Sequence, residues 1–223
     1  MPELTLYSAR ACPFAHRTRL VLAEKKVDFE LVEIDLANKP SWFGTVSGYG
    51  KVPAIHHGDV RLWESAVINE YLDEVFPVPR LLPSEPALRA RARIWIDFAN
   101  TQLVSSYGAS LRGKTEGERA AARDELQKHL AFLENEGLAK LSGEGPFFLG
   151  ATPSLVDFTL FPWFERWPAL QELRQVSIPK ELTRLARWID AVAALPSAKS
   201  QANPASFYIE RYAKLFAPKA VAS

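Results

Sequence analysis

A stretch near the N-terminus decides the fold class: Leu4-Thr5-Leu6-Tyr7-Ser8-Ala9-Arg10-Ala11-Cys12-Pro13-Phe14. Residues 4–8 are rich in β-forming side chains and predict a short strand. Pro13 suits the first position of a helix, because its missing N–H would have no partner there anyway. Apolar residues then recur at helical spacing. The stretch therefore predicts a strand, a short loop that ends at Cys12, and a helix over 13–26.

The following residues extend this start into an α/β unit. The pattern predicts a strand over 29–34, a loop over 35–50 with a short helix at 40–43, a hairpin of strands over 52–57 and 60–63, and a helix over 64–75. The order is strand, helix, strand, followed by strand, strand, helix. It is typical of a small α/β domain, which we assign to residues 1–76.

A change of composition follows this domain. Four prolines punctuate the next ten residues, and proline at that density disfavours both helix and sheet. We therefore predict a linker over 77–86. Beyond it the sequence predicts an all-α domain over 87–223, with helices over 87–112, 116–141, 155–167, 179–195 and 204–216. Thr115 with Glu118, and Ser154 with Asp157, provide capping signals at the starts of two of these helices.

The composition excludes several classes of protein. In 223 residues, 48% are hydrophobic and 24% are charged, which is typical of a globular chain. Lys and Arg number 27 and Asp and Glu 26, so no general attraction to nucleic acid or an anionic membrane is expected. The single cysteine excludes an internal disulfide and a multi-cysteine metal site. With no signal peptide and no long apolar run, we expect a cytoplasmic protein without a metal.

Cys12 is the main candidate for chemistry. It stands directly before the predicted helix, where unpaired N–H groups and the positive end of the helix dipole favour a thiolate over a thiol. A thiolate in a loop is a nucleophile. Ala15 occupies the place of the second cysteine of a C-x-x-C motif, so the site cannot close its own disulfide and needs a thiol from solution. The alternative is that Cys12 is a small buried hydrophobic residue, as a lone cysteine often is.

Three further positions suggest binding, each with a structural alternative. A cis Val52–Pro53 bond would free the Val52 backbone to pair with an extended peptide, whereas a trans bond would mark an ordinary edge strand. Ser65 would lie at a helix N-terminus, where anions bind, or serve only as an N-cap. Lys39 and Trp42 lie in a predicted loop, where a cation and an aromatic ring could contact a ligand. The alternative is that Lys39 is only a solvated charge and Trp42 only a ring that packs against the protein.

Together these features resemble the glutathione transferase superfamily, and within it the omega class and its lambda-like relatives. The resemblance covers nearly the whole chain and rests on Cys12-Pro13-Phe14-Ala15, Asn38-Lys39-Pro40-Ser41-Trp42-Phe43, Lys51-Val52-Pro53, Trp63-Glu64-Ser65, Asn69-Glu70-Tyr71-Leu72-Asp73 and Phe161-Pro162-Trp163-Phe164-Glu165-Arg166. It implies an α/β thioredoxin-like N-terminal domain followed by an all-α helical domain.

The resemblance also implies a site for glutathione as co-substrate. Cys12 would form a mixed disulfide with glutathione, and Phe14 would pack beside it. Lys39 would bind the glycyl carboxylate, and Val52, before a cis Pro53, would pair with the cysteinyl backbone. Glu64 and Ser65 would bind the γ-glutamyl group. A second-substrate pocket would lie between the domains, with Tyr107, Trp163 and Trp167 as candidates. Each of these rings could instead be core packing.

The function implied is a glutathione-dependent thiol transferase, active in deglutathionylation, disulfide exchange or dehydroascorbate-type reduction. Its partners would be a small hydrophobic electrophile or a glutathionylated substrate, and a second copy of the chain in a homodimer. Two alternatives stay open. One is a conjugating transferase for small aromatic electrophiles, in which a hydroxyl activates the glutathione thiol. The other is a non-catalytic interaction scaffold with the same fold.

Overall fold

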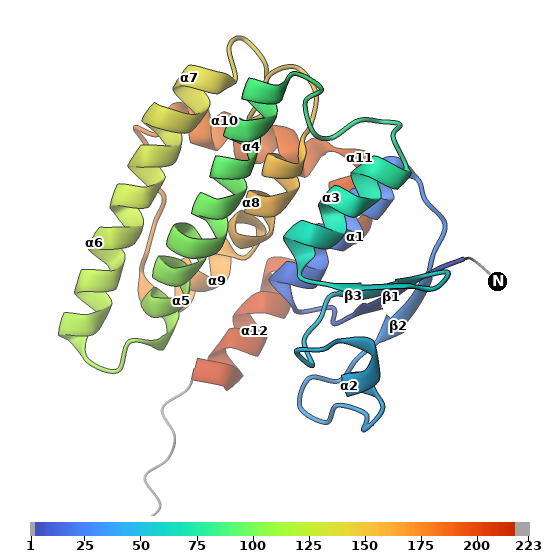
Figure 1. The fold of residues 1–223 in the computed structure, drawn as a ribbon. Helices are drawn as coiled ribbons and strands as arrows, with labels where there is room; N and C mark the ends of the chain where they lie inside the picture. The colour runs from blue at the N-terminus through green and yellow to red at the C-terminus, as the bar shows by residue number, and fades with distance from the viewer. Residues whose placement is uncertain (1–2, 217–223) are drawn as a thin grey trace, which may run out of the picture.

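A four-stranded sheet forms the centre of the N-terminal part in a computed structural model that describes residues 3–216 (Figure 1). Its strands are β1 (Leu4–Ser8), β2 (Glu30–Glu33), β3 (Ala54–His57) and β4 (Val60–Trp63), in the order β2-β1-β3-β4. Strand β1 runs parallel to β2 and antiparallel to β3, and β3 and β4 form a hairpin. The predicted strands are confirmed, with β2 and β3 shorter than expected.

Helices cover both faces of this sheet (Figure 1). On one face, α1 (Pro13–Lys25) and α3 (Ser65–Val75) pack on Leu6 and Ile55, which are fully buried. On the other face lies α2 (Phe43–Val46), in a smaller apolar cluster. The sequence predicted a short helix at 40–43, whereas the helix in the structure begins at the last residue of that segment, Phe43. Phe43 is buried in the cluster beside the sheet.

The helical part contains two long helices, each with a π-helical turn inside it. The first comprises α4 (Pro86–Phe98), the turn Ala99–Leu103 and α5 (Val104–Arg112); the second comprises α6 (Glu116–Phe132), the turn Leu133–Leu138 and α7 (Ala139–Leu141). Both follow the predicted spans of 87–112 and 116–141 closely. Thr115 and Glu118 form the expected capping box at the start of α6.

The last third of the chain departs further from the predicted boundaries. It contains α8 (Leu155–Glu165), α9 (Trp167–Arg174), α10 (Thr183–Ala194), α11 (Pro196–Gln201) and α12 (Ala205–Phe216). The sequence patterns missed α9 and α11. Each of these helices has a proline in its first turn. Proline is favoured at the start of a helix but also marks the end of one, so the sequence alone did not distinguish a new helix from a loop.

Helix α1 joins the two parts of the molecule. It packs against α3 on the sheet side and against α8 and α11 on the helical side. The proline-rich segment between α3 and α4 is anchored as well, because the Asp73 carboxylate accepts hydrogen bonds from the amides of Leu81 (2.8 Å) and Leu82 (2.9 Å). Within residues 3–216, no helix has the length and apolarity that a membrane span requires.

Candidate active site

Cys12 caps the N-terminus of α1. Its backbone is extended, with φ −75° and ψ 120°, and the loop before it is closed by a 2.8 Å hydrogen bond from its amide to the Ala9 carbonyl. The side chain is partly exposed, and Sγ lies 3.7 Å from the Val52 carbonyl oxygen. A partly exposed sulfur at a helix N-terminus is in the position that favours a reactive thiolate.

The segment opposite Cys12 is the entry to β3. The peptide bond between Val52 and Pro53 is cis, the form that the resemblance implied. Both residues are buried, and Val52 packs in the apolar cluster beside Ala15 of α1. The backbone of Val52 and the sulfur of Cys12 therefore face each other across a short gap between two elements.

A corner at the start of α3 brings Glu64 and Ser65 to this side of the sheet. Glu64 has φ 70°, a region that a non-glycine residue rarely adopts, and its side chain is exposed. Ser65 is the first residue of α3 and is buried. The strained corner holds the Glu64 carboxylate at the surface and the Ser65 hydroxyl inside. Such strain is retained where the surroundings fix it, and it gathers at functional sites.

Arg17 connects this corner to the helical part, a role that sequence reasoning missed. Its guanidinium donates to Ser65 Oγ (3.2 Å), to Asn100 Oδ1 (2.6 Å) and to the Thr159 carbonyl (2.9 Å). Burial lowers the pKa of Arg17, and the nearby Cys12 and Glu64 raise it. A cation is thus buried behind both the thiol and the Ser65 hydroxyl. Arg17 follows Cys12 closely in the chain, but nothing in the neighbouring residues indicates that it is buried.

Lys39 lies at the rim of the site. Its side chain is exposed, and Nζ donates a 2.8 Å hydrogen bond to the Gly50 carbonyl, two residues before Val52. The cation is therefore attached to the loop that leads into the cis bond. Trp42 is also largely exposed and packs edge-on against Tyr7.

The aromatic residues expected around a second substrate fall into two groups. Phe14 is half-buried and meets the buried Trp163 of α8 edge-to-face, with ring centroids 5.2 Å apart. Tyr107 and Trp167 lie in the helical core instead. Tyr107 Oη donates to the Arg166 carbonyl (3.1 Å), and Trp167 Nε1 donates to the carbonyl of a loop residue (2.9 Å). Burial also raises the pKa of Tyr107 well above its usual value.

Across residues 3–216, no three His, Cys, Asp or Glu side chains are grouped to hold a metal ion. The chemical groups at the site are a thiol, a buried guanidinium, a rim ammonium, a carboxylate and an aromatic pair. Such a set can hold a zwitterionic, peptide-like ligand and exchange a thiol with it.

Comparisons with known proteins agree with this geometry. Residues 11–75 match the family model described as glutathione S-transferase, N-terminal domain, and residues 116–191 match glutathione S-transferase, C-terminal domain. Glutathione S-transferase omega-1 of Mus musculus is 34% identical over 211 residues, covering 93% of this chain and 84% of the relative. The chain belongs to the glutathione S-transferase family. Its curated relatives include the omega class, as the sequence resemblance implied.

Solved structures of this family have the same fold. The Tau class glutathione S-transferase of mango, Mangifera indica, superposes with a TM-score of 0.89 at 29% identity, covering 96% of this chain and 98% of the mango chain. The dehydroascorbate reductase of Chlamydomonas reinhardtii superposes with a TM-score of 0.79 at 27% identity, covering 96% and 98% of the two chains. The predicted fold of a thioredoxin-like domain followed by a helical domain is therefore confirmed.

Proposed function

We propose that this glutathione S-transferase is a thiol transferase in which Cys12 carries glutathione as a mixed disulfide. One observation carries the proposal: the only sulfur nucleophile of the chain caps α1 and faces the Val52 backbone at 3.7 Å. A cysteine in this place can itself bond to a glutathionyl sulfur, whereas a hydroxyl could only hold a glutathione thiolate by a hydrogen bond.

The reaction would proceed in two exchanges. The Cys12 thiolate attacks the glutathionyl sulfur of a mixed disulfide, a new S–S bond forms, and the partner leaves as a thiolate that takes a proton from water. A second glutathione, as its thiolate, then attacks the sulfur of that glutathione. Oxidised glutathione leaves, and the Cys12 thiolate is restored. Overall, the mixed disulfide and one glutathione give the free partner thiol and oxidised glutathione, whose other half is the glutathionyl group of the substrate.

The charges around Cys12 match those of glutathione, which has two carboxylates and one ammonium. Lys39 is the exposed cation for the glycyl carboxylate. Ser65, at the N-terminus of α3 with Arg17 behind it, would receive the γ-glutamyl carboxylate, and Glu64 the ammonium. The backbone of Val52 would pair with the cysteinyl residue between them. Glu64 with Ser65, then Val52, then Lys39 would thus bind the γ-glutamyl, cysteinyl and glycyl residues of glutathione in turn.

The second substrate would approach over Phe14, the partly exposed member of the aromatic pair with Trp163. Small oxidised molecules and glutathionylated compounds with an apolar part would suit this surface. The dehydroascorbate reductase neighbour and the omega-1 relative support this class of substrate. The core positions of Tyr107 and Trp167 leave them no direct part in our proposal.

We also propose that the protein acts in the cytoplasm as a homodimer. Val67 of α3 and Ile94 of α4 are large apolar side chains that are more than half exposed, and a second subunit would cover them. Between the same two helices, Arg93 pairs with Glu70 of its own chain. Light scattering coupled to size exclusion would report twice the chain mass, whereas a monomer at micromolar concentration would contradict the dimer.

Disulfide exchange between glutathione and hydroxyethyl disulfide tests the proposed reaction. Wild type should turn over, and Cys12→Ala should lose turnover while keeping the thermal unfolding temperature of wild type, since Cys12 is partly exposed. Cys12→Ser would replace the nucleophile with a hydroxyl and should lose exchange while gaining conjugation of a chloronitrobenzene. A wild type that conjugates the chloronitrobenzene and does not exchange disulfides would support the conjugating alternative instead.

A further inference from the structure

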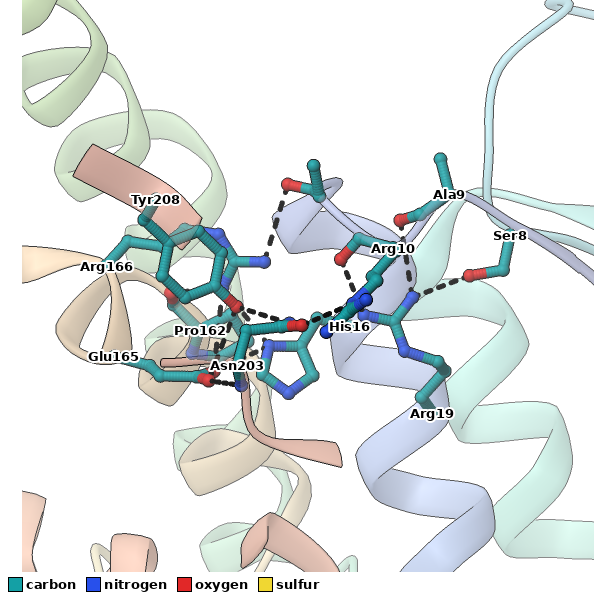
Figure 2. A network of polar contacts seen from close by, with 11 residues as sticks. Ser8, Ala9, Arg10, His16, Arg19, Pro162, Glu165, Arg166, Asn203 and Tyr208 are labelled. Carbon is teal, nitrogen blue, oxygen red and sulfur yellow. Dashed lines mark hydrogen bonds and ion pairs between the residues drawn. The ribbon is translucent and has the colours of Figure 1, made fainter. Parts of the chain in front are cut away.

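A buried polar network lies directly behind the loop that carries Cys12 (Figure 2). It contains side chains from α1, from the end of α8, from the segment before α12 and from α12 itself: His16, Arg19, Glu165, Arg166, Asn203 and Tyr208. Arg19 is linked to the others through Arg10, whose carbonyl accepts from Arg19 and whose Nε donates to Asn203 Oδ1 (2.6 Å). All six side chains are buried or nearly so. None of them belongs to the proposed glutathione contacts, so the network needs a separate explanation.

The network holds the backbone that leads into Cys12. Arg19 donates to the carbonyls of Ala9 (3.3 Å) and Arg10 (3.1 Å). Arg166, from the other part of the molecule, makes the longest contact of the three, 3.5 Å to the Ala11 carbonyl. Three successive carbonyls before the nucleophile thus face buried guanidinium groups, and both domains contribute.

Arg166 is itself fixed on several sides. Its side chain is fully buried, Nη1 donates to the Pro162 carbonyl (2.7 Å), and the guanidinium stacks on the Tyr208 ring at 4.3 Å. The Glu165 carboxylate lies 3.8 Å from Arg166 and accepts from the Tyr208 hydroxyl at 3.3 Å. Through these contacts the position of Arg166 depends on the packing of α12.

The charges of the network do not cancel. Burial lowers the pKa of His16 to about 4, although Glu165 raises it and Arg166 and Arg19 lower it further. His16 is therefore neutral at pH 7, and within the network only Glu165 opposes the two guanidinium groups. At its edge the Arg10 guanidinium adds a third cation and donates to Asn203 Oδ1 (2.6 Å), while the Arg10 backbone amide donates to the Glu33 carboxylate. Surplus positive charge then remains behind a loop that presents a sulfur nucleophile.

We propose that Arg166 is a positioning residue, which holds the loop of residues 9–11 and thereby couples the Cys12 nucleophile to the packing of α12. The inference rests on the proposed function, since the group being positioned is the Cys12 thiolate. Arg166 touches no substrate in this account and acts only through the loop.

The test is the reaction of Cys12 with iodoacetamide, measured across pH in wild type and Arg166→Lys. Lysine keeps the positive charge and loses the planar fork that reaches Pro162, His16 and Ala11 together. We expect the alkylation rate at pH 7 to fall about fivefold, which corresponds to one lost hydrogen bond. The midpoint of the rate against pH should rise. In turnover, kcat should fall while KM for glutathione stays near the wild-type value.

Tyr208→Phe provides a milder second variant. It keeps the ring under Arg166 and removes only the hydroxyl that bonds Glu165 and Asn203. We expect about a twofold fall in the alkylation rate, in the same direction as for Arg166→Lys. This variant keeps the proposal falsifiable if Arg166→Lys does not fold, because an unchanged rate in folded Tyr208→Phe would then overturn the coupling to α12.

Arg119→Lys is the matched control. Arg119 also uses its guanidinium to hold backbone carbonyls, those of Gly113 (3.2 Å) and Lys114 (3.3 Å), and its hydrogen bonds reach neither the Cys12 loop nor α12. This variant loses the same planar fork and should leave the alkylation rate per folded molecule unchanged. If folded Arg166→Lys alkylates at the rate and pH midpoint of wild type, Arg166 is structural only and the proposal is overturned.

The two proposals fail in different ways. Iodoacetamide reacts with Cys12 whether or not glutathione binds, so slowed alkylation in Arg166→Lys supports the positioning role by itself. A wild type that turns over with glutathione while Arg166→Lys alkylates normally would leave the proposed function intact and remove only the positioning role. A wild type without turnover, combined with slowed alkylation in Arg166→Lys, would support the positioning role and contradict the proposed function.

Discussion

Helices α1 and α6 are both rich in charged residues, yet the fold places their charges in opposite surroundings. In α1 all three cations, Arg17, Arg19 and Lys25, are buried. In α6 only Leu126 and Leu130 are buried, and the charged residues pair along the helix surface, as Glu116 does with two arginines. One helix lies between two domains and the other lies at the edge of the molecule (Figure 1).

A charged residue contributes differently to stability at the surface and in the interior. A surface pair contributes at most about 1 kcal/mol, because water screens both partners. A buried cation without its acceptors would be strongly destabilising, so each cation of α1 is surrounded by oxygen atoms. Several of those acceptors belong to the β1–α1 loop, to α3 and to α8, which carry residues of the candidate active site. The others lie in the turn that contains Asn100 and in the segment after α3. The buried charges of α1 therefore connect the fold to the site.

The largest expected effect is at Lys25. Its Nζ donates to Asp73 Oδ1 and to the carbonyls of Phe76 and Pro79, each at 2.7 Å. Lys25→Met would leave the buried Asp73 carboxylate without its cation and should lower the free energy of unfolding by about 3–5 kcal/mol. The matched change on α6, Lys128→Met, should lower it by less than about 0.5 kcal/mol. Urea unfolding of both variants measures the contrast, and equal losses would contradict it.

The next effect is a dependence of stability on pH that comes from His16. Burial lowers its pKa from 6.5 to about 4, so between these values the unfolded chain binds a proton that the folded chain does not. The stability is fully present above pH 6.5 and should fall by roughly 3 kcal/mol as the pH falls to 4.

Two variants separate this effect from other histidines. His16→Gln should flatten the slope of unfolding free energy between pH 4 and 6.5. His129→Gln, on α6, should leave most of the slope in place, because burial lowers the pKa of His129 while the nearby Glu125 raises it. A wild-type slope that survives in His16→Gln would show that the buried histidine is not its source.

The capping box of α6 should have an intermediate effect. Thr115 Oγ1 accepts from the Glu118 amide at 3.1 Å, and both side chains are exposed. Thr115→Ala should lower the free energy of unfolding by about 1 kcal/mol without changing turnover, since α6 contributes no residue to the site. Thr115→Ser, which keeps the hydroxyl, serves as the control. If Thr115→Ala lowered the free energy of unfolding by more than Lys25→Met, the polar contacts of α6 would matter more for stability than those of α1.

The smallest effect is expected at the surface pairs of α6. Glu116→Gln removes the partner of Arg119 at 3.0 Å and of Arg123 at 3.4 Å. The free energy of unfolding should fall less than in Thr115→Ala, and the difference from wild type should vanish in 1 M salt, where the screening length is about 3 Å. A larger loss that persists in salt would mean that α6 depends on its charges as α1 does.

The order of elements could be predicted because each is marked by local patterns. The local patterns include the β-forming side chains of β1, Pro13 at the start of α1, and the proline-rich segment before α4. Cys12 could be singled out for the same reason, since its position at a helix start follows from the next residue.

The buried network could not be predicted, because its partners are distant in the chain. Arg17 bonds the carbonyl of Thr159, 142 residues later, and His16 contacts Arg166, 150 residues later. Charged residues such as Arg17 and Arg19 are usually exposed on a helix, whereas the structure buries both. A polar face and a buried interdomain face look alike in sequence when the acceptors lie in another domain.

Intact mass spectrometry shows whether Cys12 carries glutathione. Wild type incubated with oxidised glutathione should gain the mass of one glutathione, located by peptide mapping at Cys12 and removed by reduced glutathione. Cys12→Ala should gain nothing, which controls for non-covalent adducts. A wild type that turns over in the exchange assay and yet never gains glutathione, even when trapped by acid, would contradict the mixed-disulfide mechanism.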